Sequence, residues 1–582
     1  MPDCPFNPAA ENIADLIYRF GSLQSERWNN TSSLCADYVS SDYIILHMPL
    51  TPDAVSMRVH PYYMIPSLFS PLDYNAMEAS GILSAFNSPA LNNQGKGVLI
   101  GLVDTGIDYR SPLFQNPDGT TRIAGIWDQS VPIEEGVLPA GVPDYYPMGG
   151  SSYGTEYTRE QINEALASDD PLSLVPTQDT IGHGTFLAGL SAGSSIPQED
   201  FTGAAPEAEL AVVKLKPAKK YLRDFYLIPS DAPAFQENDI MMGIKYLRMM
   251  ADRLKKPLVI LLAMGSNSGS HIGTSPLSQV TQNYSGFFGI ITVIACGNET
   301  GAAHHFYASI PAGTEYEDVE IRVGKEEAER GFVLELWAAD ADTYTVGFIS
   351  PSGERISRIP IIANNETSIP FLLDATTITV NYQLIEAESG SQLIFIPFQT
   401  PAAGIWTVRV YNTQRFKGTF HMWLPVQGMI SEETVFLRPD PYSTITVPGN
   451  SRLPITVGAY DTSTGGIYIH SSRGFTPNQI VKPELAAPGV NILGPSVGRK
   501  PGSDTPMTTR TGTSAAAAIT AGAAANLLGW GIVEGNYPTM SEASVKSYLI
   551  RGAQRNPALT YPNREFGYGT LDLFQTFLRL RE

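Results

Sequence analysis

Cysteine is scarce in this chain of 582 residues, and its three cysteines, Cys4, Cys35 and Cys296, stand far apart. Three cysteines cannot build a disulfide framework, and no two of them have the spacing of metal ligands. The sequence therefore favours a reducing or thiol-tolerant setting. No acidic cluster has the spacing of a calcium cage, so the sequence assigns no metal and no cofactor, and calcium stays open.

Long apolar runs and an excess of basic residues are missing as well. No stretch of the sequence is apolar for long enough to predict a membrane span. Residues 1–20 lack the basic start of a signal peptide, so we expect no ordinary secretory export. With 58 acidic against 38 basic residues, the formal charge of −20 argues against nucleic acid or an anionic membrane surface as a partner.

The apolar pattern predicts a small first unit and then an α/β domain. Helical spacing in 11–20 and a strand at 43–48 predict an α+β unit over residues 1–65, which ends in a proline-rich linker. Residues 66–314 alternate buried strands with helices, which predicts a doubly wound, mostly parallel sheet. Strands are expected at 97–103, 210–215, 258–263 and 289–295.

Two segments interrupt this alternation. Between 127 and 175 the periodicity is lost, and we expect a surface excursion with one helix near 159–167. Between 315 and 428 the helical signal nearly disappears, and short β-rich runs predict an inserted β-sandwich or jelly roll. The α/β pattern resumes over residues 429–582, so the insert lies inside the α/β domain.

Two motifs in the first half of the chain offer an acid and a base. Asp104 ends the run 97–103, where open α/β sheets place their sites, although an aspartate there also fits an ordinary turn. His183 lies between Gly182 and Gly184 at the start of a small-residue helix. A lone histidine is more often structural, but the flanking glycines clear space around its ring.

Two motifs further along the chain offer a nucleophile and a donor. Ser514 follows Gly512 and precedes a run of alanines, which fits a nucleophile at a helix start or simply a capped helix. Asn298 follows the strand 289–295 and a glycine. It fits a turn residue, or an amide that presents its N–H₂ group to a cleft.

The motifs occur together in the order Asp, His, Ser, which is the order in subtilisin. The chain resembles the subtilase family in four motifs, at 103–106, 182–185, 295–298 and 512–515, and 482–490 resembles the strand before the nucleophile. The insert, Phe186 and the missing signal peptide resemble more narrowly the Csp-type proteases of spore-forming bacteria. Those enzymes process a cortex-lytic enzyme in germination, which implies an intracellular or spore-associated protein.

The resemblance implies a subtilisin-like serine endopeptidase. Ser514 would attack the scissile carbonyl, His183 would accept and return its proton, and Asp104 would orient the imidazole. Asn298 and the backbone N–H of Ser514 would form the oxyanion hole. The expected partner is a protein or peptide substrate. The backbone that would pair with it and the small residues that would flank its pocket are Met264, Gly265, Ser266, Ala295 and Gly297.

The resemblance also implies that residues 1–65 are a propeptide. It would be removed by self-cleavage in the proline-rich linker, and whether it then stays bound is open. An ordinary small domain that is never removed is the alternative.

The chain departs from the family pattern at two places. Phe186 replaces the usual second histidine after the His-Gly-Thr motif, and residues 515–518 are all alanine where Met-Ala-Xaa-Pro is usual. Neither change removes a catalytic group, although both alter the packing at a helix start.

Three rival hypotheses are tested by the same motifs. An inactive subtilase relative that acts as a binding or regulatory protein is disfavoured because all four catalytic groups are present. An aspartic protease needs a second Asp-Thr-Gly or Asp-Ser-Gly, which the chain lacks. An α/β-hydrolase needs Gly-Xaa-Ser-Xaa-Gly around its nucleophile, and Ser514 fails that pattern.

Overall fold

The chain divides into two compact units, Met1–Pro71 and Leu72–Glu582. The structure is a computed structural model that describes residues 13–19, 36–38, 43–49, 74–89, 91–131, 154–218, 220–339, 341–362, 366–386, 389–498 and 505–580. The division falls slightly after the predicted end of the first segment at residue 65. The predicted cleavage linker, Cys4 and Cys35 lie outside the described residues.

The first unit contains a three-stranded antiparallel sheet in the order β1-β3-β2, with β1 at Ile13–Arg19, β2 at Ala36–Tyr38 and β3 at Tyr43–Pro49. The strand predicted at 43–48 is confirmed as β3. The helix predicted over 11–20 is wrong, because that segment is β1 and pairs with β3 along its whole length. Its β-branched and aromatic residues suit a strand, and this pairing overrides the apolar spacing.

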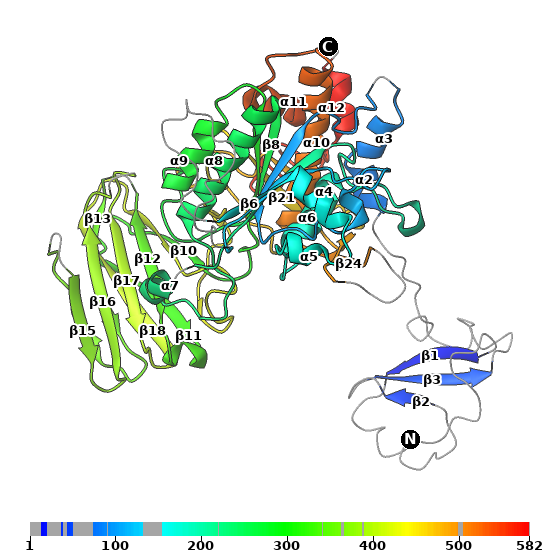
Figure 1. Ribbon diagram of the computed structural model, residues 1–582. Coiled ribbons are helices and arrows are strands. Elements are labelled where there is room, and N and C mark those ends of the chain that lie inside the picture. Colours follow the sequence, from blue (N-terminus) through cyan, green and yellow to red (C-terminus); the bar gives the residue numbers. More distant parts are fainter. Residues whose placement is uncertain are drawn as a thin grey trace. The chain divides into compact units, whose positions relative to one another are not determined.

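A central sheet with helices around it organises the second unit (Figure 1). It has eight strands in the order β22-β21-β9-β8-β4-β7-β5-β6. Neighbouring strands are parallel except at the edge, where β6 runs antiparallel to β5. The predicted mostly parallel sheet is therefore confirmed. Its strands are β4 Leu99–Asp104, β5 Ile123–Asp128, β6 Thr155–Thr158, β7 Glu209–Lys214, β8 Leu258–Leu262, β9 Ile290–Ala295, β21 Ile455–Tyr460 and β22 Leu485–Pro488.

The sequence missed β5 and β6 at one edge of this sheet. The expected excursion began at 127, inside β5, and it contains β6 just before the predicted helix. Strand β6 is short, and only Tyr157 of its four side chains is buried, so no alternation marks it.

Helices cover both faces of the sheet, as the alternating side chains of β4 show. Leu99 and Val103 pack in the cluster that contains α8, and Ile100 and Leu102 pack in the cluster that contains α6 and α10. The helices are α2 Tyr74–Ala79, α3 Ile82–Phe86, α4 Arg159–Leu166, α5 Pro171–Leu174, α6 His183–Ala192, α7 Lys220–Tyr226, α8 Glu237–Leu254, α9 Pro276–Tyr284, α10 Thr513–Leu528, α11 Glu542–Gly552 and α12 Leu573–Arg579. Shorter helical turns lie at Pro112–Phe114, Pro197–Glu199, Lys325–Ala328 and Gly529–Val533.

One stretch of the described residues, Thr513–Val533, is long and apolar enough to cross a membrane by composition. It contains α10, and 83% of its most apolar window is buried inside the fold. Its composition therefore matches its place as the central helix against the sheet, where it packs on β8, β9 and β21.

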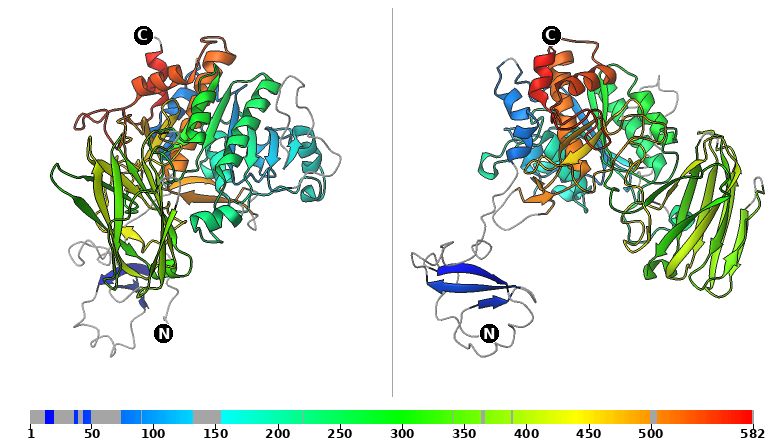
Figure 2. Two further views of the ribbon diagram at one scale, coloured as in Figure 1. Left: turned by 90° about the vertical axis from the view of Figure 1, so that its left-hand side faces the viewer. Right: turned by 180° about the vertical axis from the view of Figure 1, so that it is seen from behind.

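The insert is a sandwich of two antiparallel sheets (Figure 2). The strand orders in the two sheets are β10-β19-β12-β17-β16-β15 and β14-β13-β18-β11-β20. Its first strand begins at His305 and its last ends at Phe436, so it extends beyond the predicted range 315–428 at both ends. Its strands are β10 His305–Ser309, β11 Tyr316–Val323, β12 Phe332–Ala338, β13 Thr343–Ile349, β14 Arg355–Ile356, β15 Glu366–Phe371, β16 Thr376–Gln383, β17 Leu393–Gln399, β18 Gly404–Gln414, β19 Thr419–Trp423 and β20 Val435–Phe436. A separate pair, β23 Ile492–Pro495 and β24 Met507–Arg510, precedes α10.

Candidate active site

The predicted site residues come from elements that end or begin at one edge of the main sheet. Asp104 is the last residue of β4, His183 is the first of α6, and Asn298 follows β9. Ser514 lies in the first turn of α10. A cleft of about 1430 Å³ is lined by His183, Asn298 and Ser514 together, with Asp104 buried behind the histidine.

Asp104 and His183 form a close pair. The Nδ1 atom of His183 lies 2.8 Å from Oδ1 and 3.0 Å from Oδ2 of Asp104. The aspartate is 2% exposed, whereas the histidine side chain is 25% exposed and faces the cleft. Burial disfavours the imidazolium, but the charge and hydrogen bond of Asp104 outweigh burial and raise the pKa of His183 above its usual value.

Two glycines allow this approach. A Cβ atom on Gly184 would lie 2.2 Å from the carbonyl oxygen of Gly106, so only glycine lets α6 begin against the loop after β4. Gly182, before the helix, has a φ of 78°, which glycine adopts without strain. Gly184 therefore allows α6 to touch the loop after β4, and Gly182 allows the backbone turn before the helix, in addition to the space that both leave for the ring of His183.

Asp179 ties the aspartate loop to the histidine helix, a role that sequence reasoning missed. Its Oδ1 accepts hydrogen bonds from Thr105 Oγ1 at 2.9 Å and from the N–H of Gly182 at 2.7 Å. Its Oδ2 accepts from the N–H of Thr185 at 2.9 Å and from Thr185 Oγ1 at 2.8 Å. A carboxylate just before a helix start is a usable sequence signal, because unpaired N–H groups gather there.

Phe186, the departure beside His183, has a packing role. Its ring is buried against Gly494 of β23, and the guanidinium of Arg510 lies over it at 5.4 Å from the ring centre. The charge of Arg510 acts to lower the pKa of His183, although less than Asp104 raises it. The ring of Phe186 thus makes a cation–π contact with Arg510, whose charge acts on His183.

Ser514 is partly exposed, while Thr513 and Ala515 on either side are buried. Among the hydrogen bonds of the described residues, none joins Ser514 to His183, so the structure brings them to one cleft without a bond between them. The small residues that follow let α10 approach its neighbours. A Cβ atom on Gly522 would lie 2.4 Å from the Cβ of Ala204.

Asn298 is held by the start of α10. Its Oδ1 accepts a hydrogen bond from the N–H of Thr513 at 3.1 Å. Because the oxygen of the amide is used, its N–H₂ group is the end left to face the cleft that Asn298 lines with Ser514. This is the donor orientation that an oxyanion hole requires.

The structure separates the five predicted substrate-binding residues into two groups. Met264, Gly265 and Ser266 line the cleft, whereas Ala295 and Gly297 are not among the described residues that line it. Ser266 exchanges backbone hydrogen bonds with Val447 at 3.0 and 2.9 Å. Since successive residues of an extended strand point their backbone groups to opposite edges, Gly265 faces the open edge.

Thr446 fills the space between the two groups. A Cβ atom on Gly265 would lie 2.4 Å from Thr446 Oγ1, and one on Gly297 would lie 2.6 Å from Thr446 Cγ2. The threonine is 3% exposed and was not singled out from the sequence. It occupies the space between Gly265 and Gly297, two of the residues that were expected to flank the pocket.

The remaining polar groups near the site give no metal centre. Cys296, beside Asn298, is fully buried, and burial raises the pKa of its thiol to about 12, so it is not a thiolate at neutral pH. Within the described residues, no three His, Cys, Asp or Glu side chains gather in a way that could hold a metal ion.

Comparison with known proteins gives the class and the family. The doubly wound sheet and the ordered Asp, His and Ser motifs define a protein of the subtilisin-like class. The sequence profile of the subtilase family matches residues 95–349 and 438–569, so the chain belongs to the subtilase family, as its motifs predicted.

One solved structure is similar to this chain over most of its length. The CspB protease of Clostridium perfringens is 30% identical, with a TM-score of 0.75, and the match covers 88% of this chain and 98% of that one. This confirms the fold class and the narrower resemblance to Csp-type proteases.

Plant relatives are more distant. Two subtilisin-like proteases of Arabidopsis thaliana, SBT3.5 and SBT3.12, are each 23% identical, over 545 and 485 residues. These matches cover 87% and 81% of this chain. The chain spans only 64% and 59% of the length of these relatives.

Proposed function

We propose that the chain hydrolyses peptide bonds with Ser514 as nucleophile, His183 as general base and acid, and Asp104 as the group that orients the histidine. The observation that carries the proposal is the contact of His183 Nδ1 with the buried carboxylate of Asp104, in a cleft shared with Ser514. A serine hydroxyl is a weak nucleophile at neutral pH, so it needs a base beside it.

The two steps of the reaction follow from these groups. His183 accepts the proton of Ser514 as the serine oxygen bonds to the scissile carbonyl carbon, and Asp104 stabilises the imidazolium that forms. The imidazolium then donates its proton to the leaving amine as the carbon–nitrogen bond breaks. In the second step a water molecule attacks the acyl carbon while His183 accepts its proton. The imidazolium then returns that proton to the oxygen of Ser514 as the ester bond breaks, which releases the acid product and restores the serine.

Asn298 stabilises the charge that develops in both steps. The tetrahedral intermediate carries a negative oxygen, and the N–H₂ group of Asn298 and the N–H of Ser514 donate hydrogen bonds to it. The N–H of Ser514 belongs to the first turn of α10, where backbone N–H groups have no partner within the helix. Loss of one such donor typically costs about 2.7–4 kcal/mol of barrier height.

Labelling with a fluorophosphonate tests this assignment. The wild type should be labelled once, and Ser514→Ala should not be labelled although its circular dichroism is unchanged. Ser463→Ala, which changes an exposed turn serine, is the matched control and should label fully. A folded wild type that neither labels nor cleaves peptides would instead identify an inactive relative with a binding or regulatory role.

We propose that the first unit is a propeptide that the enzyme removes from itself. This proposal rests on the resemblance to the subtilase family. We expect the cut within about residues 58–72. Wild type and Ser514→Ala should be expressed side by side, and their amino termini and masses determined. The mutant should remain whole, and addition of wild type should not restore its processing if cleavage is intramolecular. Equal processing of both proteins would contradict self-cleavage.

The substrate proposal is narrower. On the Csp-type resemblance, we propose limited proteolysis of a protein zymogen, a cortex-lytic enzyme activated during spore germination. The test is incubation of the purified zymogen with wild type and with Ser514→Ala. A single cut that generates lytic activity with wild type alone supports the proposal, and unchanged zymogen contradicts it without affecting the peptidase assignment.

A further inference from the structure

The β-sandwich joins the catalytic fold at the wall of the cleft. Glu299, the residue after Asn298, is 6% exposed and binds three segments of the chain. Its carboxylate accepts hydrogen bonds from Asn267 Nδ2 at 3.0 Å and from the N–H of Gln427 at 3.2 Å, and lies 3.1 Å from His304 Nδ1. One carboxylate thus holds together the segment that leads into β10, the connection between β19 and β20, and the loop that follows Ser266.

The sandwich is also docked onto that loop. Glu335 of β12 accepts hydrogen bonds from the N–H of Gly269 at 3.0 Å and from Trp337 Nε1 at 2.9 Å. His271 stacks on Trp423 of β19, with the ring centres 3.9 Å apart. The inner half of the six-stranded sheet, β10-β19-β12, is therefore fixed against the catalytic fold.

The outer half of the same sheet turns one face to the cleft. In the strand registers, Glu335 lies opposite Phe395, Phe395 opposite Asn381, and Asn381 opposite Glu366. These four side chains share one face, and all of them line the cleft that holds Ser514. Their sequence neighbours, such as Leu334 and Ile394, point into the sandwich core. The active-site cleft thus continues across the sheet face.

The chemistry of this face is acidic with an apolar platform. The sandwich contributes the carboxylates of Glu335, Glu366 and Glu386 to the cleft, and no lysine or arginine from its described residues. Burial raises the pKa of Glu335, so the charge of the face comes chiefly from Glu366 and Glu386. Phe225 of α7 stacks on Phe395 with ring centres 5.2 Å apart and is 56% exposed. A charged side chain that binds this face must therefore be a cation.

The two cations elsewhere in the cleft do not offset these carboxylates. Arg223 donates to the carbonyl oxygens of Pro229 and Ala232, each at 2.9 Å, and Arg510 lies over Phe186 at the other end, beside His183.

We propose that this face, with α7, is a distal substrate-binding surface for an extended polypeptide segment that lies amino-terminal to the scissile bond and carries lysine or arginine beside an apolar residue. The inference rests on the proposed peptidase function. Its direction follows from Gly265, whose open edge is expected to pair with the residues before the bond, and from the path of that loop through Gly269 to Glu335. Residues further from the bond on the same side then reach the sheet.

Paired peptides test the surface with the full-length chain. One is a short chromogenic peptide that the wild type cleaves, and the other is the same peptide extended at its amino end by a segment with lysine and leucine. The extension should raise kcat/KM by about fivefold or more, an effect that weakens with added salt. Extension with glutamate in place of lysine, or at the carboxyl end, should give no gain.

Two variants locate the effect. Glu366→Gln and Phe225→Ser should each lower the ratio of kcat/KM for the extended peptide over the short one. Glu320→Gln, which changes an exposed glutamate of β11 on the other sheet, is the matched control and should keep the wild-type ratio.

The outcomes separate the two proposals. If the wild type cleaves the short peptide but gains nothing from the lysine extension, or gains equally from glutamate, the distal surface is wrong and the peptidase stands. If the protein is folded but cleaves neither peptide, and the fluorophosphonate does not label it, the peptidase function itself fails. A gain that persists fully in both Glu366→Gln and Phe225→Ser also overturns the surface.

Discussion

At the scale of single residues, the site depends on the charge of buried carboxylates and on glycines, whose lack of a side chain lets backbone segments touch. The carboxylate of Asp104 sets the protonation of His183, and Gly184 lets the two elements that carry them touch. Asp179 fixes both elements through four hydrogen-bond donors from Thr105, Gly182 and Thr185. Each of these residues acts on the position or the proton of the histidine.

Asp104→Asn should change both the rate and its pH dependence. Because Asp104 raises the pKa of His183, the neutral base of the wild type is lost as pH falls through that raised value. In the variant the charge is gone and burial lowers the pKa of the histidine, so the acidic limb of kcat/KM should move to lower pH. The maximal rate should fall about 10⁴-fold.

The pH profile of kcat/KM for a peptide substrate checks this prediction. Asp118→Asn, in an exposed turn, is the control and should keep the wild-type profile. An acidic limb that stays in place in Asp104→Asn would show that another group titrates.

Thr446→Gly should widen the acceptance of the residue before the cleaved bond. The threonine side chain occupies the space between Gly265 and Gly297, so its removal opens that space. The preference for leucine or phenylalanine over alanine should rise about tenfold, the size expected for a few buried methylene groups. Thr446→Ser, which loses only Cγ2, should give an intermediate change in kcat/KM, and an unchanged preference in both variants would place the pocket elsewhere.

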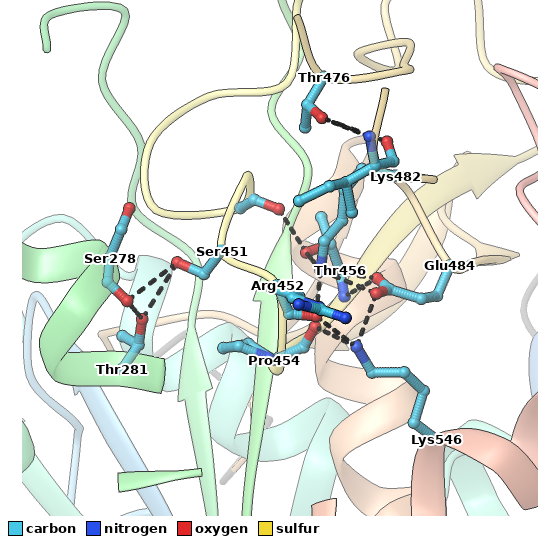
Figure 3. Close-up of polar contacts among 12 residues, drawn as sticks. Ser278, Thr281, Ser451, Arg452, Pro454, Thr456, Thr476, Lys482, Glu484 and Lys546 are labelled. Atoms are coloured by element: carbon cyan, nitrogen blue, oxygen red, sulfur yellow. Dashed lines mark hydrogen bonds and ion pairs between the residues drawn. The ribbon is translucent and has the colours of Figure 1, made fainter. Parts of the chain in front are cut away.

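At the scale of elements, the parallel sheet brings the site together and a buried polar cluster holds α11 to it (Figure 3). Lys482 is fully buried, and its Nζ lies 3.0 Å from Glu484 Oε2 and 2.7 Å from the carbonyl oxygen of Pro454. Lys546 of α11 reaches Glu484 Oε1 at 2.7 Å. Glu484 also accepts from the N–H of Thr456 on β21, so this one carboxylate links α11 to β21 and to the buried Lys482.

Glu484→Gln should destabilise the fold strongly. It leaves the ammonium groups of Lys482 and Lys546 close together without the carboxylate between them. Breaking a buried pair in this way typically costs about 3–5 kcal/mol of the free energy of unfolding. Urea denaturation followed by tryptophan fluorescence measures the change. Glu433→Gln, on the exposed surface of the sandwich, should leave stability within about 0.5 kcal/mol of the wild type.

At the scale of the whole molecule, stability should depend on pH through Glu542 at the start of α11. Its Oε2 accepts from the N–H of Thr292 at 2.6 Å, and its Oε1 is buried without a partner. Burial raises the pKa of Glu542 from 4.5 to about 8. The folded state therefore holds a proton that the unfolded state releases, and the stabilisation is complete below pH 4.5 and lost as pH rises through about 8.

Glu542→Gln should remove this part of the pH dependence. The free energy of unfolding of the wild type should fall between pH 5 and pH 8 more steeply than that of the variant, because glutamine does not titrate. Thermal unfolding at a series of pH values checks it. Equal slopes for the two proteins would mean that Glu542 stays ionised in the fold.

The whole molecule also shows where sequence reasoning succeeds. Buried parallel strands such as β4 and β9 are continuous apolar runs, and polar residues that end them fall at one sheet edge, so Asp104 and Asn298 could be placed from the sequence. The strand at 13–19 could not, because its apolar spacing also fits a helix and only pairing with β3 decides the matter. Ala295 and Gly297 were expected at the cleft, yet neither lines it, and Thr446, distant in sequence, stands beside Gly297.

The sequence by itself determined the family, the order of the motifs and the mostly parallel sheet, because these depend on local residue types and on the apolar period along each strand. Only the tertiary structure decided that Asp179 joins the loop after β4 to the start of α6, that Thr446 fills the space between Gly265 and Gly297, and that one face of the β-sandwich continues the cleft. These features arise from contacts between residues far apart in the chain, and no local pattern encodes such a contact.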